Sequence, residues 1–367
     1  MSEQIILKSD NNYIELDDYL KSANIQKPML VCGQSIELLT IGRHMRELDN
    51  IVRFMDFEPN PSYDSVVKGV EVFNINNCDG IIAIGGGSAM DVAKCIKLFA
   101  NLDSSRDYIE QEPVPNDIPL IAMPTTAGSG SESTRYAVIY YRGEKYSVTD
   151  SGCIPTAVIL DSSVLKTLSE YQRKSTMLDA LCHAIESYWS VNSNDLSKDY
   201  SRRAIRMVLD NLDAYLQNDD TANENMLIAS NLAGKAINIT ATTAGHAMSY
   251  KITGLYNVAH GHAVAMCVAE IWHYMLENIN DCTDVRGCEY LSETFTELAK
   301  IFGFDSQVAA ADKFTEIYKG LNLPCPSVRG EEWDILAGSV NERRLKNNPV
   351  KLSYDTLNML YHRILCQ

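Results

Sequence analysis

The chain has 367 residues, of which 46% are hydrophobic and 22% are charged, and 48 acidic against 32 basic residues give a formal net charge of −16. A chain of this length is expected to form two packed domains rather than one core. So acidic a surface argues against binding to nucleic acid or to an anionic membrane, because both require clustered Lys and Arg.

The N-terminal stretch is polar and acidic where a secretory signal needs an apolar segment, and no apolar run approaches the roughly 20 residues that span a bilayer. We therefore expect a cytoplasmic protein. The ten cysteines form no CxxC pair, and Cys32, Cys95, Cys182 and Cys267 stand in apolar surroundings, as is typical of reduced thiols. Only one pair, Cys282 and Cys288, is close enough in sequence to suggest a disulfide.

Up to Asp161, short apolar runs alternate with helical patterns, which predicts βαβ units around a mostly parallel sheet. Helices are expected between the early strands, over residues 35–48 and 63–76, and another follows the strand that ends at residue 84. The predicted strands are residues 29–32, 51–55, 80–84, 119–123, 137–141 and 156–160.

After Asp161 the strand signals end and apolar residues recur with a helical period. The predicted domains are an α/β dinucleotide-binding domain, residues 1–162, and an all-helical metal- and substrate-binding domain, residues 163–367. The helices expected in the second domain are residues 171–190, 197–217, 224–239, 262–278, 289–302 and 309–321.

Three consecutive glycines, Gly85, Gly86 and Gly87, follow a buried strand and precede an amphipathic helix. Glycines let backbone amides approach an anion closely, and the free amides and dipole of the helix favour negative charge there. With Ser88, this turn predicts a pyrophosphate site. The pattern is not the G-x-G-x-x-G fingerprint, and a tight turn that binds nothing is the alternative.

A second loop rich in glycine and hydroxyl groups follows the next strand, in PLIAMPTTAGSGSEST. Such a loop alone is often simple turn chemistry. Two of them at the carboxyl ends of neighbouring strands favour a ligand, because ligands of open α/β sheets bind there. Its candidate donors are Thr125, Thr126, Ser129, Ser131 and Thr134.

Asp179 and His183 are four residues apart on a helical pattern, so both face one side of the helix. His246 and His260 come from later stretches of the chain. Together the four offer one carboxylate and three imidazoles, a set that suits Fe²⁺ or Zn²⁺ with a position left for substrate. The alternative is that Asp179 and His183 form an intrahelical pair and the other two are ordinary polar residues. His262 is a candidate for the substrate pocket.

In these motifs the chain resembles the iron-containing (group III) alcohol dehydrogenases over almost its whole length. The matching stretches, in the same order and at similar separations, are GGGSAMDVAK, PTTAGSGSE, KYSV…PTAVILD, DALCHAIESY and HAMSYKITGLYNVAHGHAVA.

The resemblance implies an N-terminal dinucleotide-binding domain, a helical domain and an active site in the cleft between them. It implies metal ligation by Asp179, His183, His246 and His260, and it implies an NAD(P)H cofactor. It also suggests a homodimer. The implied cofactor contacts are Gly33, Ser35, Gly85, Gly86, Gly87, Ser88 and Asp91, with Thr125, Thr126, Ser129, Thr134 and Lys145 on the nicotinamide half.

Two positions depart from the family pattern. Many members have His four residues after the third metal ligand, where this chain has Tyr250, and HAMSYKIT looks like the subgroup that reduces phosphonoacetaldehyde. Tyr250 and the cationic Lys251 are therefore candidates to hold a phosphonate, unless Lys251 faces solvent and Tyr250 packs. NAD-preferring relatives often have Asp at the position of Gly33, and its absence removes a repulsion of the 2′-phosphate, which favours NADPH.

The expected function is reduction of a small aldehyde to an alcohol, phosphonoacetaldehyde to 2-hydroxyethylphosphonate, by Lewis-acid polarisation and hydride transfer. Tyr250 and His262 are the candidate proton donors. The alternatives are a general short-chain alcohol dehydrogenase for butanol-like or propanediol-like substrates, a lyase of the dehydroquinate synthase type, and a non-catalytic metal- or nucleotide-binding protein.

Overall fold

The computed structural model describes residues 4–9 and 12–365, and these divide into two compact units. The first unit runs to Thr126 and resumes over Gly130–Thr167, whereas the second combines Ala127–Ser129 with the chain from Leu168 onward. The division lies five residues beyond the expected boundary at residue 162, because the 3-10 helix η5 (Ser162–Thr167) stays with the first unit.

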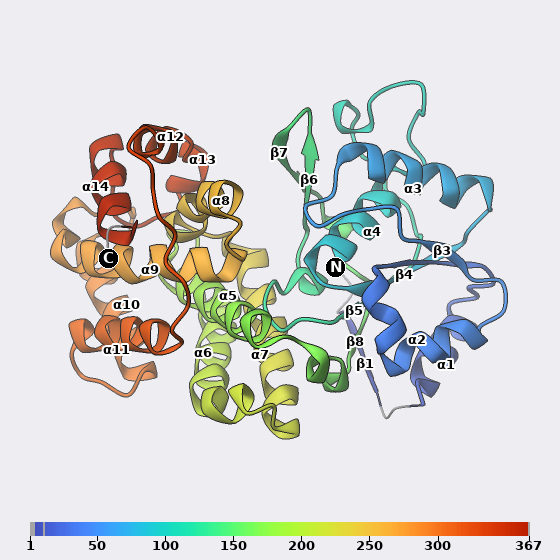
Figure 1. Ribbon diagram of the computed structural model, residues 1–367, viewed down its shortest axis with the longest axis horizontal. Coiled ribbons are helices and arrows are strands. Elements are labelled where there is room, and N and C mark those ends of the chain that lie inside the picture. Colours follow the sequence, from blue (N-terminus) through green and yellow to red (C-terminus); the bar gives the residue numbers. More distant parts are fainter. Residues whose placement is uncertain (1–3, 10–11, 366–367) are drawn as a thin grey trace. The chain divides into compact units, whose positions relative to one another are not determined.

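The first unit contains a six-stranded sheet in the order β1-β8-β5-β4-β2-β3, and every neighbouring pair is parallel (Figure 1). β2, β4 and β5 are buried along their whole length, so their continuous apolar sequences are those of a sheet covered on both faces. The strands are β1 (Ile5–Lys8), β2 (Pro28–Cys32), β3 (Val52–Phe54), β4 (Gly80–Gly85), β5 (Leu120–Pro124) and β8 (Ala157–Leu160).

Three strands differ from the expectation. The predicted strand 137–141 is β6 (Tyr136–Tyr141), but it pairs antiparallel with β7 (Glu144–Thr149) in a separate hairpin. Arg142 and Gly143 make the turn, both with positive φ, which suits a two-residue hairpin loop. β7 was not predicted because it is exposed and polar. β1 was not predicted because it is a four-residue edge strand beside polar residues.

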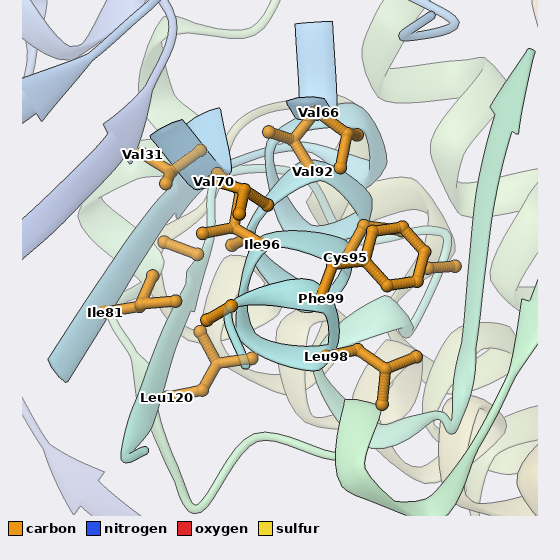
Figure 2. Close-up of a cluster of buried hydrophobic side chains, with 14 of the residues drawn as sticks. Val31, Val66, Val70, Ile81, Val92, Cys95, Ile96, Leu98, Phe99 and Leu120 are labelled. Carbon is orange, nitrogen blue, oxygen red and sulfur yellow. The ribbon is translucent and has the colours of Figure 1, made fainter. Parts of the chain in front are cut away.

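One face of the sheet is covered by α3 (Tyr63–Ile75) and α4 (Gly87–Phe99). Figure 2 shows Val66 and Val70 of α3 beside Val92 and Ile96 of α4, above Ile81 of β4. This packing fixes the direction of α4, so its N-terminus stays at the carboxyl end of β4.

The N-terminal region adds two helices, α1 (Ile14–Ser22) and α2 (Thr40–Glu47). The predicted helix 35–48 is in fact the 3-10 helix η1 (Gln34–Leu38) followed by α2, because Leu39 between them has extended φ and ψ angles. α1 was not predicted.

The second unit is helical in the part of the chain that the structure describes, apart from one isolated bridge between Cys282 and Val350. All six predicted helices are present with small changes at their ends. They are α5 (Glu170–Trp189), α6 (Asp195–Leu216), α7 (Asp220–Thr240), α9 (His260–Glu277), α10 (Cys288–Ile301) and α11 (Gln307–Gly320).

Four further helices of this unit were not predicted: α8 (Ala244–Tyr256), α12 (Glu332–Gly338), α13 (Glu342–Leu345) and α14 (Tyr354–Leu365). α8 matters most for the site. Its first six residues are all buried, so no polar face marks them as helical in the sequence.

Among the described residues every cysteine is a free thiol, including Cys282 and Cys288, and the four expected to be buried are buried. None of the helices drawn from residues 4–9 and 12–365 combines the length and the apolar character needed to cross a membrane.

Candidate metal centre and nucleotide-binding edge

Three adjacent strands of the first unit end side by side at the expected nucleotide site. Cys32 of β2 is in register with Ile84 of β4, and Gly85 is in register with Pro124 of β5. The Thr125 amide donates to the Gly85 carbonyl over 2.9 Å, which ties the two glycine-rich loops together. The carboxyl ends of parallel strands are where open α/β sheets bind ligands.

The N-terminus of α4 opens directly onto this edge. Gly86 precedes the helix in an extended conformation, and its lack of a side chain leaves the first helical amides without a side-chain cap. Such amides, together with the helix dipole, attract a phosphate. Ser88 is partly exposed beside them, and its hydroxyl accepts from the Asn60 amide over 3.3 Å.

Asp91, a predicted cofactor contact, is held inside the first unit. One carboxylate oxygen accepts from the Ser131 hydroxyl over 3.0 Å and the other accepts from the Val138 amide over 3.1 Å. Burial raises the pKa of Asp91, while Lys94 and these hydrogen bonds act in the opposite direction. The visible role of Asp91 is to anchor the second loop and β6 to α4.

Lys94, which sequence analysis did not single out, completes this network. Its ammonium group donates to the Ser131 hydroxyl (2.9 Å), the Thr134 hydroxyl (3.1 Å) and the Tyr136 carbonyl (2.7 Å), and its side chain is fully buried. Burial lowers the pKa of Lys94, and the Asp91 charge opposes that effect. The sequence signal that could have indicated this pair is the three-residue spacing of Asp91 and Lys94 on one helix.

The other predicted cofactor residues are spread along the same unit, except Ser129, which belongs to the second unit. Thr126 and Ser129 are partly exposed, whereas Ser35 and Lys145 are exposed. Gly33 borders open space, with no atom within 4 Å of where a Cβ would stand.

Beyond Gly33, two arginines that the sequence did not point to converge on one carboxylate. Arg53 and Arg46 both donate to Glu37, which lies in η1 just after Gly33, the first over 3.1 Å. They place positive charge near the end of β2.

In the second unit, three predicted metal ligands come together from three helices. Potential ligand atoms of Asp179 (α5), His246 (α8) and His260 (α9) all lie within 4.8 Å of one another. Asp179 and His246 are buried, whereas His260 is partly exposed. The cluster is therefore most accessible to solvent on the side of His260.

The chemistry of this cluster fits a divalent cation. Asp179 Oδ1 and His246 Nε2 are both buried without a hydrogen-bond partner among the described residues, and they face each other at 3.6 Å. Buried polar atoms are rarely left unsatisfied, and a cation coordinated by both would satisfy both. One carboxylate with imidazoles is a ligand set that Fe²⁺ and Zn²⁺ accept.

His183, the fourth predicted ligand, packs against this group, but it is not among the residues whose ligand atoms all lie within 4.8 Å of one another. Its ring stacks on that of His246, with centroids 4.3 Å apart. Its Nδ1 lies 3.3 Å from the Gly128 carbonyl, which can only accept, so Nδ1 carries the hydrogen and Nε2 keeps its lone pair. Burial lowers the pKa of His183 to about 4, so the ring is in the neutral form that binds metals.

Glu186, which sequence analysis missed, supports His246 from behind. Its fully buried carboxylate contacts His246 Nδ1 and accepts from the Thr243 hydroxyl (2.6 Å), the Thr243 amide (3.1 Å) and the Gly245 amide (2.9 Å). It therefore caps the start of α8 and directs His246 Nε2 away from itself, toward Asp179. The available signal was its position seven residues after Asp179, on the same helix face.

Gly261 allows α9 to approach α5 closely enough for His260 to reach Asp179. A Cβ at Gly261 would stand 2.1 Å from the Ser175 carbonyl oxygen and 2.6 Å from Asp179 Cβ. Backbone cannot yield to such an overlap, so only glycine fits here.

The three predicted catalytic residues are placed differently. Tyr250 stacks on His260 with centroids 5.4 Å apart and nearly parallel rings. Lys251 is partly exposed. His262 is buried beside Tyr171, whose hydroxyl is 3.2 Å from its Nδ1, and it points about 200° around α9 from His260, since residues advance about 100° each. Burial lowers the pKa of His262 to about 4.

We predict that Gly261→Ala weakens metal binding by at least about 10-fold, because the added methyl group must push α9 and His260 away from Asp179. Titration against a chelator of known affinity measures this. The control is Gly254→Ala in α8, where a Cβ meets nothing within 4 Å. Equal metal affinity in both variants would contradict the close-approach argument.

We also predict that Glu186→Gln lowers metal affinity about 10- to 100-fold, because the amide cannot hold His246 Nδ1–H and the α8 amides as the carboxylate does. The readouts are chelator competition and the visible spectrum of the Co²⁺-loaded protein. A matched control is Glu297→Gln, a carboxylate of the same unit that binds Tyr188 and Lys198 instead. An unchanged spectrum and affinity in Glu186→Gln would show that Glu186 is not a positioning residue.

Two family models match the two parts of the chain. The model of the family "Iron-containing alcohol dehydrogenase" matches residues 4–162, and that of "Fe-containing alcohol dehydrogenase family, C-terminal" matches residues 174–365.

Among curated relatives, 1,3-propanediol dehydrogenase of Citrobacter freundii is 33% identical over 68% of each chain. Aldehyde-alcohol dehydrogenase 2 of Entamoeba histolytica is 34% identical over 60% of this chain, which spans only 27% of that longer protein.

Among solved structures, sulfoacetaldehyde reductase from Bifidobacterium kashiwanohense in complex with NAD⁺ has a TM-score of 0.87 and 26% identity, and the match covers 99% of this chain and 97% of that one. The chain is therefore an oxidoreductase of the iron-containing alcohol dehydrogenase family, with the α/β and helical units of that fold.

Proposed function

We propose that this protein is a metal-dependent, NAD(P)H-linked reductase of a small aldehyde that carries an anionic group, with phosphonoacetaldehyde as substrate and 2-hydroxyethylphosphonate as product. The observation that carries the proposal is the convergence of Asp179, His246 and His260, with two buried ligand atoms that have no hydrogen-bond partner in the described part of the chain. Asp179, His183, His246 and His260 are the proposed ligands.

When bound, a divalent ion would supply Lewis-acid activation of a carbonyl, and the nicotinamide would supply the hydride. The chain's own residues prepare both positions. Glu186 orients His246, and the Gly128 carbonyl fixes the tautomer of His183. Gly85, Gly86, Gly87 and the amides of α4 would bind the pyrophosphate, with Ser88 beside them.

A proton must reach the product oxygen after hydride transfer. Tyr250 is the better placed of the two proposed donors, because its ring stacks on His260. Its hydroxyl accepts a hydrogen bond from the Arg344 guanidinium, which has no lone pair to offer in return, so the phenol proton is directed elsewhere. His262 is neutral and faces another side of α9, which suits a role in shaping the pocket rather than in donating a proton.

The anionic substrate rests on two independent observations. HAMSYKIT, with Tyr250 and Lys251, resembles the subgroup that reduces phosphonoacetaldehyde. One related solved structure is named a sulfoacetaldehyde reductase, and sulfoacetaldehyde is also a two-carbon aldehyde with a tetrahedral anion. The resemblance to 1,3-propanediol dehydrogenase favours the second candidate, a general short-chain alcohol dehydrogenase.

The cofactor preference proposed is for NADPH. Gly33 itself has no carboxylate, and near it Arg46 and Arg53 outnumber the one carboxylate that they bind, Glu37. Both features reduce repulsion of a 2′-phosphate.

The test is a substrate panel on Fe²⁺-reconstituted full-length protein, with phosphonoacetaldehyde and butyraldehyde, each under NADPH and NADH. We expect metal-dependent oxidation of the cofactor that is lost on chelation. We also expect kcat/KM to be at least about 10-fold higher for phosphonoacetaldehyde than for butyraldehyde, because charge-assisted hydrogen bonds to the phosphonate stabilise its binding. Equal values for both aldehydes would favour the general alcohol dehydrogenase. An absence of net NAD(P)H oxidation with every aldehyde would refute the reductase itself.

A further inference from the structure

A single arginine from the C-terminal region lies beside the proposed metal centre. Arg344 of α13 donates from Nη1 to the Tyr250 hydroxyl over 2.6 Å and to the Thr242 hydroxyl over 3.3 Å. Its guanidinium carbon also lies 4.9 Å from the centroid of the Tyr250 ring.

This placement is built into the fold. Asn347 Nδ2 donates to the Thr242 carbonyl over 3.1 Å, and Asn347 Oδ1 accepts from Asn192 Nδ2 over 3.1 Å. These bonds tie the segment after α13 to the residues just before α8 and just after α5. Tyr250 in turn stacks on His260. One aromatic ring therefore separates the guanidinium from an imidazole of the metal cluster.

Among the described residues, no carboxylate forms an ion pair with Arg344. Both its hydrogen-bond acceptors are neutral hydroxyls, and within the described parts of the chain no carboxylate oxygen lies within 4.0 Å of it. By contrast, Arg286 in the same unit is paired with Asp284 at 2.6 Å. In a chain with a net charge of −16, an unpaired and partly buried arginine is a costly arrangement unless an anion completes it.

The guanidinium also has unused donors. Only Nη1 makes hydrogen bonds to described residues, so the N–H groups of Nε and Nη2 remain for another acceptor. That pair forms a planar fork, which matches two oxygens of a phosphonate, sulfonate or carboxylate. Lys251, by comparison, is a partly exposed point charge, and no hydrogen bond or ion pair to a described residue fixes its direction.

We propose that Arg344 is the specificity-determining residue that binds the anionic end of the substrate while the carbonyl lies at the metal cluster. This inference rests on the proposed reductase function and names the residue that selects its substrate class. Tyr250 acts as the spacer, because it contacts both Arg344 and His260.

The experiment compares Arg344→Gln, Arg344→Lys and Lys251→Gln with the wild type, as Fe²⁺-reconstituted full-length proteins. The quantity measured is selectivity, the ratio of kcat/KM for phosphonoacetaldehyde to kcat/KM for butyraldehyde. We expect this ratio to fall about 10- to 100-fold in Arg344→Gln, mainly through the KM of phosphonoacetaldehyde, and to recover in part in Arg344→Lys. A purely structural role would lower both kcat/KM values together and leave the ratio unchanged, which would overturn the proposal. A fall confined to Lys251→Gln would overturn it as well.

Calorimetry separates this inference from the proposed reaction. Binding of 2-hydroxyethylphosphonate to the metal-loaded wild type should weaken at least about 10-fold in Arg344→Gln, whether or not the protein turns over any aldehyde. Binding that depends on Arg344 in a protein without reductase activity would refute the reaction and support the anion site. Equal binding to both proteins would refute the anion site.

Discussion

The site depends on one constraint, that buried polar atoms of three helices must be satisfied at a single point. Asp179, His246 and His260 come from α5, α8 and α9, and close packing brings their ligand atoms together. Burying a carboxylate and imidazoles is expensive unless they are paired or bind a cation. The helical unit offsets this cost with hydrogen bonds to the ligand side chains. The most extensive are those at Glu186, whose carboxylate contacts His246 Nδ1 and accepts from the first amides of α8. Gly261 meets a steric requirement of the same site, because only a residue without a side chain lets α9 pack this closely on α5.

In the first unit, the proposed nucleotide site is arranged to bind an anion, the phosphate of a nucleotide, through preformed backbone donors. Strand register places the loops after β4 and β5 next to each other, and α4 presents its free amides at that edge. The buried cluster of Asp91, Lys94 and Ser131 fixes the second loop to α4. Rigid loops position amides before the ligand arrives, which is how a phosphate site avoids the entropic cost of ordering them.

Much of this organisation could be predicted from the sequence, because strong periodicity marks the buried strands and the long helices. The metal ligands could also be proposed, since Asp179 and His183 share a helix face and motif order relates them to His246 and His260. Glu186, Lys94 and Arg344 could not be singled out in this way. Their roles arise from contacts 37 to 102 residues apart in the chain, as for Lys94 with Ser131 and Arg344 with Thr242. α8 escaped prediction for a related reason, because a buried helix start has no polar face to reveal its period. The β6–β7 hairpin escaped because local propensity does not say which sheet a strand will join.

The most direct test of the central claim is an anomalous difference map, recorded at the iron absorption edge, from crystals of the Fe²⁺-reconstituted protein. We expect one peak at about 2.0–2.2 Å from a carboxylate oxygen of Asp179 and from a ring nitrogen each of His183, His246 and His260. A peak held by other residues, or well-ordered side chains of these four without a peak, would contradict that claim.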